Sequence, residues 1–294
     1  MLNITHRRVL DSLVTSAGEN AISVDVLISD NGTPLRLTTV TRFPELRIVE
    51  ARAEIIQPNE FGPPCYLDWP LPELVGIVAG PGYVTAVRDT LKDKDLPPAL
   101  LDALVESARM QVQVGNLPLE EVEGLDFTDS KVIRRMDLTL SPELAYSCLP
   151  YTEEMDHVFE TRAIRWTGRP DIYAPREGQT YRFRRDKLLE DRYLDGKHIL
   201  NASLSDDFHE LHVTVHLSAD GERLEEIEST SVRLPFPGIC DLPFLRVPQL
   251  KGVLLDSDLS SIVIDAVGGS KGCIHLADLI LDLVRWGQNV CGLP

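Results

Sequence analysis

A thiol and an imidazole stand two residues apart in the segment Gly272-Cys273-Ile274-His275-Leu276, where a glycine-rich turn leads into the last amphipathic stretch of the chain. Thiolate sulfur and imidazole nitrogen are the usual protein ligands of zinc and of iron. A helix N-terminus also carries unpaired N–H groups and partial positive charge, which favour the thiolate form of a cysteine. The segment therefore predicts either a pair of metal ligands or an activated thiol.

Other polar residues could complete such a metal site. Cys240 follows a predicted strand, and His209 precedes another. His209 lies an even number of residues before the apolar positions of that strand, so its side chain is expected on the same, buried face. Asp206 or Asp207 could supply an oxygen ligand beside His209 or in its place. We predict a zinc or iron ion, or an iron–sulfur cluster, held by the following set: Cys240, Cys273, His275 and His209.

The alternative for each of these residues is a structural role. A lone cysteine is most often a small buried hydrophobe, and this is the role expected for Cys148 and Cys291 unless they are simply exposed. His212 and His216 alternate onto the outer face of their strand, where solvation is expected. Packing also competes with ligation at Cys240, since a similar cysteine, Cys65, recurs in the first half of the chain.

The chain carries two similar patterns. Pro72–Ile77 resembles Pro248–Val253, 176 positions later. The same spacing pairs Leu100, Asp102, Leu104 and Arg109 with Leu276, Asp278, Ile280 and Arg285. The period is far longer than that of a solenoid repeat, so it predicts two tandem copies of one domain. In the first copy Pro97 and Ala99 replace Cys273 and His275, which assigns the chemistry to the second copy.

Hydrophobic periodicity predicts strands first and helices after them in each half. In the second half, strands are expected over 199–205, 210–218 and 227–234, and helices from 248 and over the last amphipathic stretch. In the first half, strands are expected near 20–29, 34–41 and 47–57, and helices near 72–79, 83–92 and 98–113. An antiparallel sheet covered by helices on one face makes each domain α+β.

These patterns predict a degenerate N-terminal copy over 1–116, a connector over 117–180 and a C-terminal copy with the metal site over 181–294. The connector contains several prolines and an acidic run, and Met136–Leu140 is expected to form a short strand within it. A charge run is usually a solvated surface, so no chemistry is assigned to this segment.

Composition excludes several classes of function. The formal net charge of −17 argues against nucleic acid and against an anionic membrane surface as partners. No apolar run is long enough to span a membrane, and the N-terminus lacks the apolar core of a signal peptide. Five cysteines, an odd number in a long chain, suit a reducing compartment. A soluble cytoplasmic protein is expected.

The second half resembles a bacterial family known only as a domain of unknown function. The resemblance rests on a Gly-Cys-Thr-His-Leu-type segment that opens the last helix, an upstream cysteine, and a His-Asp-Met-like step before a strand. Here these read Gly272–Leu276, Cys240 and His209-Glu210-Leu211, with Ile274 and Glu210 as departures. The resemblance covers roughly residues 180–290 and implies no particular reaction.

A more distant resemblance is to the iron–sulfur scaffold proteins of the NifU and IscU type. These proteins place a cysteine after the last strand and a His/Cys pair at the start of the final helix, with an aspartate before a strand. Cys240, Cys273 with His275, and Asp206 or Asp207 occupy comparable places, although the order within the pair differs and one thiol is missing. The resemblance implies a cluster scaffold as an alternative function.

The predicted function is therefore metal binding in the C-terminal copy. An open coordination position would allow metal-activated water chemistry with Glu210 or Asp207 as base, whereas four protein ligands would make the site structural. Three alternatives remain: an iron–sulfur scaffold or carrier, a metal-free accessory subunit of a larger enzyme, and a thiol nucleophile at Cys273. A protein partner or a second copy of the chain is the kind of partner expected.

Overall fold

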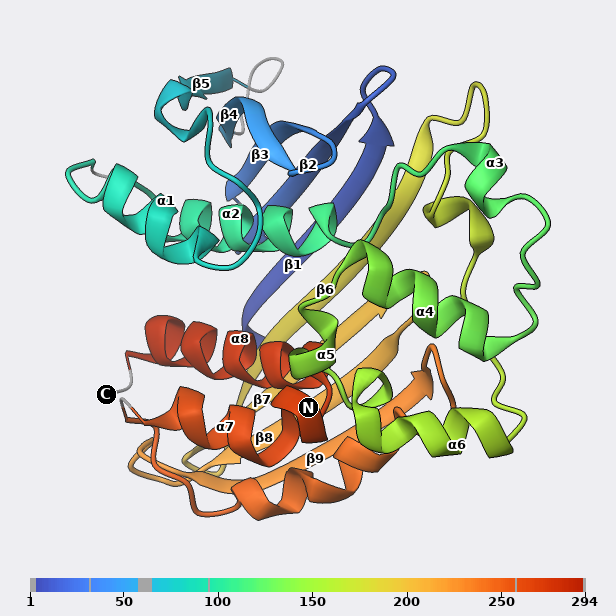
Figure 1. Ribbon diagram of the computed structural model, residues 1–294. Coiled ribbons are helices and arrows are strands. Elements are labelled where there is room, and N and C mark those ends of the chain that lie inside the picture. The colour runs from blue at the N-terminus through green and yellow to red at the C-terminus, as the bar shows by residue number, and fades with distance from the viewer. Residues whose placement is uncertain (1–3, 32, 58–64, 95, 257, 293–294) are drawn as a thin grey trace. The chain divides into compact units, whose positions relative to one another are not determined.

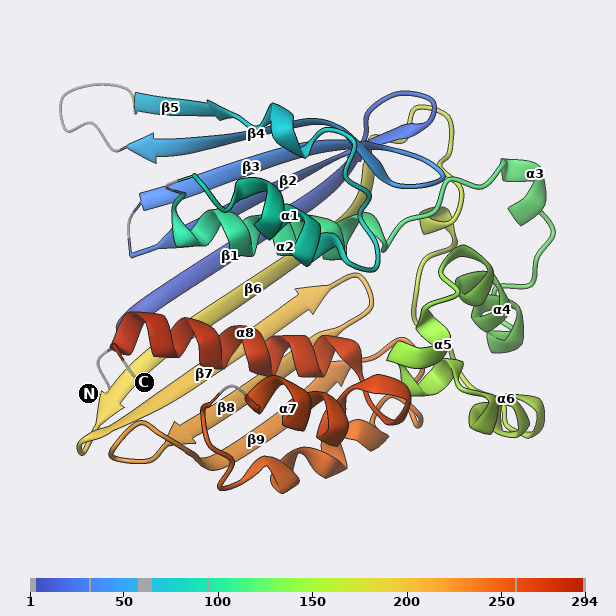
Figure 2. The ribbon, with the colours of Figure 1, turned by 60° about the vertical axis from the view of Figure 1, so that its left-hand side comes forward.

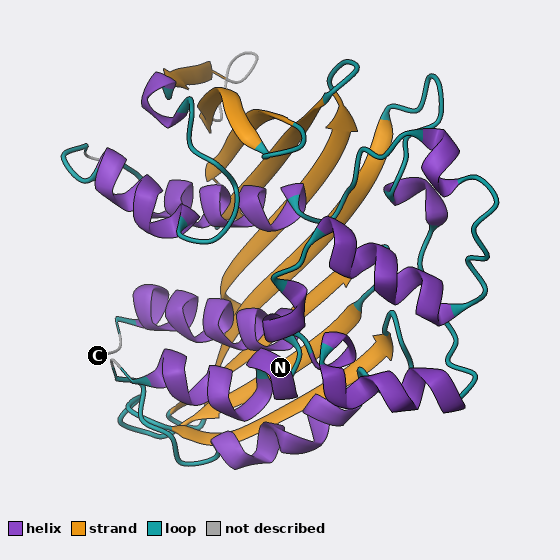
Figure 3. Ribbon diagram, viewed as in Figure 1, coloured by secondary structure: helices purple, strands orange, loops and turns teal. Residues whose placement is uncertain are grey.

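The computed structural model describes residues 4–31, 33–57, 65–94, 96–256 and 258–292, without the side chains of Thr33 and Cys65. It contains an antiparallel sheet of nine strands in the order β5-β4-β3-β2-β1-β6-β7-β8-β9, with helices packed on its strands (Figures 1 and 3). This arrangement confirms the α+β class. None of the described helices is long and apolar enough to cross a membrane.

The chain forms two compact units. The C-terminal unit comprises Met1–Arg7, Gly124–Gly168 and Lys187–Pro294, and the N-terminal unit comprises Arg8–Glu123 and Arg169–Asp186. Two long strands, β1 (Ile4–Ser16) and β6 (Tyr181–Leu194), contribute residues to both units. The start of β1 therefore belongs to the same unit as α8.

In the C-terminal unit, β6 is followed by β7 (Lys197–Asp206), β8 (Glu210–Leu217) and β9 (Leu224–Arg233). Alternation between apolar and polar residues places Leu211 and Val213 on the buried face and His212 on the exposed face of β8. The predicted strands of this half are confirmed within a few residues. The 3₁₀ helix η5 (Leu242–Leu250) follows β9 and contains Pro248.

Two helices pack on the strands of this unit, α7 (Leu259–Val267) and α8 (Ile274–Cys291), with the short turn η6 (Gly269–Lys271) between them (Figure 2). Along α8 the predicted apolar stripe is buried, from Leu276 to Val284. Gly287 allows a close approach to β7, because a Cβ there would lie 2.5 Å from Leu200 Cδ1. The last helix is thereby held flat on the sheet.

The N-terminal unit contains β2 (Ala21–Asp30), β3 (Thr33–Arg42), β4 (Arg47–Gln57) and β5 (Cys65–Pro70). These strands are followed by η1 (Pro72–Leu74), α1 (Tyr83–Leu91) and α2 (Pro98–Gln111). Of the predicted helix over 72–79 only the first turn forms. Gly76 has a φ of 97°, a left-handed conformation that ends any helix. The short elements α3 (Leu119–Val122) and η4 (Pro170–Ile172) complete the unit.

The part of the predicted connector that belongs to the C-terminal unit, Gly124–Gly168, forms helices. It contains α4 (Ser130–Leu140), α5 (Leu144–Ser147), η2 (Leu149–Tyr151), η3 (Glu153–Met155) and α6 (Asp156–Thr161). The strand predicted over Met136–Leu140 is wrong. Those residues continue α4, whose N-cap Asp129 accepts a hydrogen bond from Lys131 N and whose Ile133 and Met136 are buried at helical spacing.

Sequence periodicity missed β1 and β6, the two longest strands. Both bury charged side chains, among them Arg8, Arg185, Lys187 and Asp191. A strand that buries charges does not show the apolar alternation by which half-buried strands are recognised. The partners that make such burial tolerable come from distant segments of the chain.

Candidate metal centre

A tight turn between β7 and β8 carries the first histidine of the predicted site. Asp206 N donates to His209 O at 2.8 Å, which closes the turn. The fully buried carboxylate of Asp206 accepts three hydrogen bonds at Oδ1, from Phe208 N at 2.8 Å, His209 N at 2.7 Å and His209 Nδ1 at 3.1 Å. Because backbone and ring are held by the same oxygen, the orientation of the His209 imidazole is determined locally.

The second histidine comes from the first turn of α8. The ring of His275 stacks on that of His209, with centroids 3.9 Å apart and planes inclined by 29°. The ligand atoms of Asp206, His209 and His275 all lie within 4.8 Å of one another. The structure thus brings together the two predicted histidines and one of the two aspartates considered with them.

The Asp206–His209 contact resembles the support given to metal-binding histidines. Such a histidine usually donates its second ring N–H to a carboxylate, which selects the tautomer and leaves the other nitrogen as a ligand. Here Nδ1 of His209 faces Asp206, so donation to the carboxylate leaves Nε2 with a free lone pair. The geometry fits either a ligand role for Asp206 or a supporting one.

The predicted cysteines are buried close to this cluster, each 4% exposed. Burial is the main cause that raises the pKa of both thiols; the charge of Cys273 adds to it at Cys240, and the charges of Asp278 and Asp206 add to it at Cys273. Neither thiol belongs to the group of ligand atoms within 4.8 Å of one another. The predicted four-residue set is therefore gathered in one unit, with its imidazoles in contact and its thiols nearby.

Burial decides the state of the Cys273 thiol. Backbone N–H groups of Leu276 and His275, at the start of α8, lower its pKa as predicted for a helix N-terminus. Desolvation is the larger effect and raises that pKa to about 11. Cys273 is thus a neutral thiol at pH 7 in the absence of a metal, which argues against an activated thiol nucleophile.

The turn before α8 admits only glycine at its last position. A Cβ on Gly272 would lie 2.0 Å from Val267 O and 2.2 Å from Val267 C, both backbone atoms. Val267 O accepts a hydrogen bond of 2.7 Å from Cys273 N, and Gly272 O accepts one of 2.9 Å from Leu149 N. The glycine of the Gly-Cys-Ile-His segment therefore sets the position of Cys273.

A third thiol was not predicted at this site. Cys148 precedes Leu149, and its pKa is raised first by burial and then by the charges of Cys273 and Cys240. The surroundings of Cys148 in the sequence carry no ligand signal, because its proximity depends on how the helical connector folds back onto the α8 turn. The side chain of Cys65, the sequence counterpart of Cys240, lies outside the described residues.

Glu210, one of two candidate bases, lies on the face of β8 that points away from the candidate site. As the residue after His209 it alternates onto the opposite face of β8, and its carboxylate is 3.9 Å from Arg233 Nη2. This placement removes Glu210 from the candidate site and leaves Asp207.

A family model described as "Protein of unknown function (DUF2889)" matches residues 172–286. The match includes β7, β8 and most of α8, and with them all four predicted ligands. Neither the curated protein sequences nor the solved structures include one that matches this chain. The second half of the chain is thus similar to a family whose function is unknown.

Proposed function

We propose that the C-terminal unit binds a transition-metal ion, zinc in the first place, through His209, His275 and one or both of Cys240 and Cys273. The observation that carries this proposal is the buried stack of two imidazoles against the Asp206 carboxylate. Protonating both imidazoles would bring like charges into contact, whereas neutral imidazoles leave lone pairs that a cation can share. The donor types, imidazole and thiol, are those that zinc prefers.

The distances are compatible with one ion. Ligand atoms held about 2.0–2.3 Å from zinc in a tetrahedron lie roughly 3.4–3.8 Å from one another. The ligand atoms of Asp206, His209 and His275 lie within 4.8 Å of one another, so small side-chain rotations would bring these three groups to that spacing. A metal would also convert the Cys273 thiol to a thiolate with release of its proton, since only the thiolate is a ligand.

A comparison of the two units supports a cation next to Asp206. We propose that they are copies of one domain, because corresponding backbone contacts recur 176 positions apart. The isolated bridge between Arg47 and Val78 recurs between Arg223 and Leu254. The bonds from Gly76 N to Ile48 O and from Gly252 N to Leu224 O recur likewise. These contacts are backbone geometry, which a resemblance between two helical patterns would not reproduce.

In the N-terminal copy the counterpart of Asp206 binds an internal cation. Asp30 ends β2 as Asp206 ends β7, and it forms a bidentate pair with Arg8 at 2.6 Å for both bonds. The same guanidinium reaches Asp102 at 2.5 Å. This copy has Ala99 where the other has His275. We infer that a fixed arginine there replaces the exchangeable ion of the C-terminal copy.

The number of protein ligands separates two roles for the ion. With both thiols and both imidazoles bound, the site is closed and stabilises the docking of α8 on the sheet. With one thiol unbound, a coordination position stays open, and a bound metal would supply Lewis-acid chemistry. In that case Asp206 would hold His209 in one tautomer, and Asp207 would be the carboxylate that accepts a proton.

One observation favours a second candidate, an iron–sulfur scaffold or carrier. Burial raises the pKa of Cys148 and of Cys240, and nearby thiols add to it: Cys273 and Cys240 at Cys148, and Cys273 at Cys240. His275 lies in the first turn of α8, two residues after Cys273. Three thiols and an imidazole form a ligand set suited to a cluster. Under this proposal Cys148 is a ligand, whereas under the zinc proposal it is a neighbour.

Metal analysis of the full chain, purified anaerobically without an affinity metal, tests both candidates. We expect a zinc ion at this site that is lost in His275→Ala and in Cys273→Ser and retained in His212→Ala, a matched substitution on the exposed face of β8. Brown protein that contains iron and sulfide and bleaches in Cys148→Ser would establish the scaffold instead. Protein with no metal before and after incubation with zinc or iron(II) would refute both and leave a metal-free accessory subunit.

A further inference from the structure

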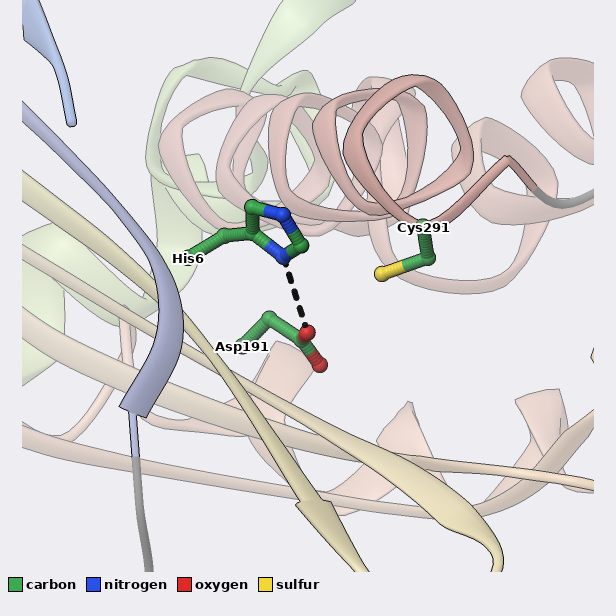
Figure 4. Close-up of side chains that lie close together, drawn as sticks. All are labelled: His6, Asp191 and Cys291. Atoms are coloured by element: carbon green, nitrogen blue, oxygen red, sulfur yellow. Dashed lines mark hydrogen bonds and ion pairs between the residues drawn. The ribbon is translucent and has the colours of Figure 1, made fainter.

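A second group of ligand-type side chains lies elsewhere in the C-terminal unit. His6 comes from the first residues of β1, Asp191 from β6, and Cys291 from the last turn of α8 (Figure 4). Their ligand atoms all lie within 4.8 Å of one another. The residues are 185 and 100 positions apart in the sequence, and Figure 4 shows their side chains converging on one point.

Asp191 is the centre of this group. Its side chain is fully buried, with His6 Nδ1 3.3 Å from Oδ2 and His198 Nδ1 2.9 Å from Oδ1. Cys291 forms a hydrogen bond to the same carboxylate. The ring centroids of Tyr193 and His198 lie 4.8 Å apart. In the described part of the chain, the carboxylate is thus surrounded by two imidazoles and a thiol.

We propose that His6, Asp191 and Cys291 form a second zinc site, with His198 as the residue that orients the carboxylate. Imidazole, carboxylate and thiolate are all zinc ligands, and three of them leave one position for water or a fourth donor. The contact between His198 Nδ1 and Oδ1 leaves Oδ2, on the side of His6 and Cys291, for the ion.

Charge explains why an ion suits this place. A buried carboxylate is costly unless a cation or several hydrogen bonds compensate it. The neighbours of Asp191 are two imidazoles and a thiol, in contrast to the arginine that compensates Asp30 in the N-terminal unit. A divalent ion would supply the positive charge, and it would displace the proton of the Cys291 thiol as the Zn–S bond forms.

This site is independent of the first one. His275 and Cys291 occupy the two ends of α8, and sixteen residues of helix span about 24 Å. The two ions would therefore not share a ligand. A zinc ion here would join the start of β1 and the end of α8 to β6, so binding would stabilise the termini of the unit.

Zinc equilibrium dialysis followed by metal analysis tests the proposal in the full chain. The first site is removed with the paired substitution His209→Gln/His275→Gln, and one zinc per chain is expected to remain. Adding either Cys291→Ser or His6→Gln should remove it, while adding His212→Gln, on the exposed face of β8, should not. Asp191 is left intact because its burial makes any substitution a risk to folding.

Cobalt(II) gives a readout that an ion pair without metal cannot produce. Cobalt bound in the His209→Gln/His275→Gln protein should show thiolate-to-cobalt charge-transfer absorption, which Cys291→Ser abolishes. Absence of zinc and cobalt from that protein, or their retention with Cys291→Ser and His6→Gln, would overturn the second site. If wild-type protein binds an ion that only the His209 and His275 substitutions remove, the first site exists and the second does not. If only the Cys291 and His6 substitutions remove it, the second site exists and the first does not.

Discussion

Gly272→Ala tests whether the turn before α8 positions the metal centre. A Cβ at this residue would lie 2.0 Å from Val267 O, so one of two backbone segments must move by more than 1 Å to restore contact of about 3.2 Å. The movement breaks the 2.7 Å bond from Cys273 N to Val267 O and disturbs the bond from Leu149 N to Gly272 O. Overpacking of about 1–3 kcal/mol and one lost hydrogen bond of about 1 kcal/mol predict a loss of roughly 2–4 kcal/mol in the free energy of unfolding.

Gly287→Ala, within α8 itself, provides the matched control. Its Cβ would lie 2.5 Å from Leu200 Cδ1, the tip of a side chain that can change rotamer, so a loss of only about 1–2 kcal/mol is expected. Urea unfolding followed by circular dichroism measures both variants against wild type, and metal analysis of the same samples measures the centre. Gly272→Ala should also lose the metal, whereas Gly287→Ala should retain it. Equal midpoints for Gly272→Ala and wild type would refute the steric argument, and a destabilised variant with full metal content would refute the positioning argument.

Three further predictions concern single side chains. Asp206→Ala removes an acceptor of three buried hydrogen bonds and should cost about 2–4 kcal/mol in urea unfolding together with the metal. A loss below about 1 kcal/mol with full metal content would contradict the role given to Asp206. In metal-free protein, Cys273 should react with iodoacetamide far more slowly than free cysteine does at pH 8. The reaction rate should rise as the pH approaches the Cys273 pKa of about 11. A fast reaction at pH 7 would instead indicate an activated thiol. Arg8→Gln should destabilise the chain by about 1–3 kcal/mol, since Asp30 and Asp102 are partly exposed and lose only part of their compensation. It should leave the metal content unchanged, and loss of metal would contradict the separate roles given to the two units.

The local features of the site were predictable because they depend on neighbours in sequence. Alternation over Glu210–Leu217 predicted β8 and placed His209 on the buried face, and the apolar stripe of α8 placed His275 in its first turn. The contact between the two rings follows once the helix packs on the sheet. Asp206 was recognised as a residue that could join them, because it ends the strand before His209.

Features that depend on distant neighbours were missed. Cys291 was expected to pack or to be exposed, and His6 and Asp191 carried no signal, because nothing near them in the sequence indicates their mutual approach. Cys148 was likewise expected to pack or to be exposed, although the connector brings it to the turn before α8. In each case the chemistry results from the packing of segments about 100 or more residues apart.

The sequence by itself determined the elements that alternate cleanly and the four candidate ligands, since periodicity and residue type are local properties. It also contained the spacing of 176 positions at which backbone contacts recur. Only the tertiary structure decided the protonation of Cys273, because desolvation and the helix N-terminus oppose each other and their balance depends on burial. It alone brought His6, Asp191 and Cys291 together, since a buried carboxylate is tolerated only where distant segments supply its partners.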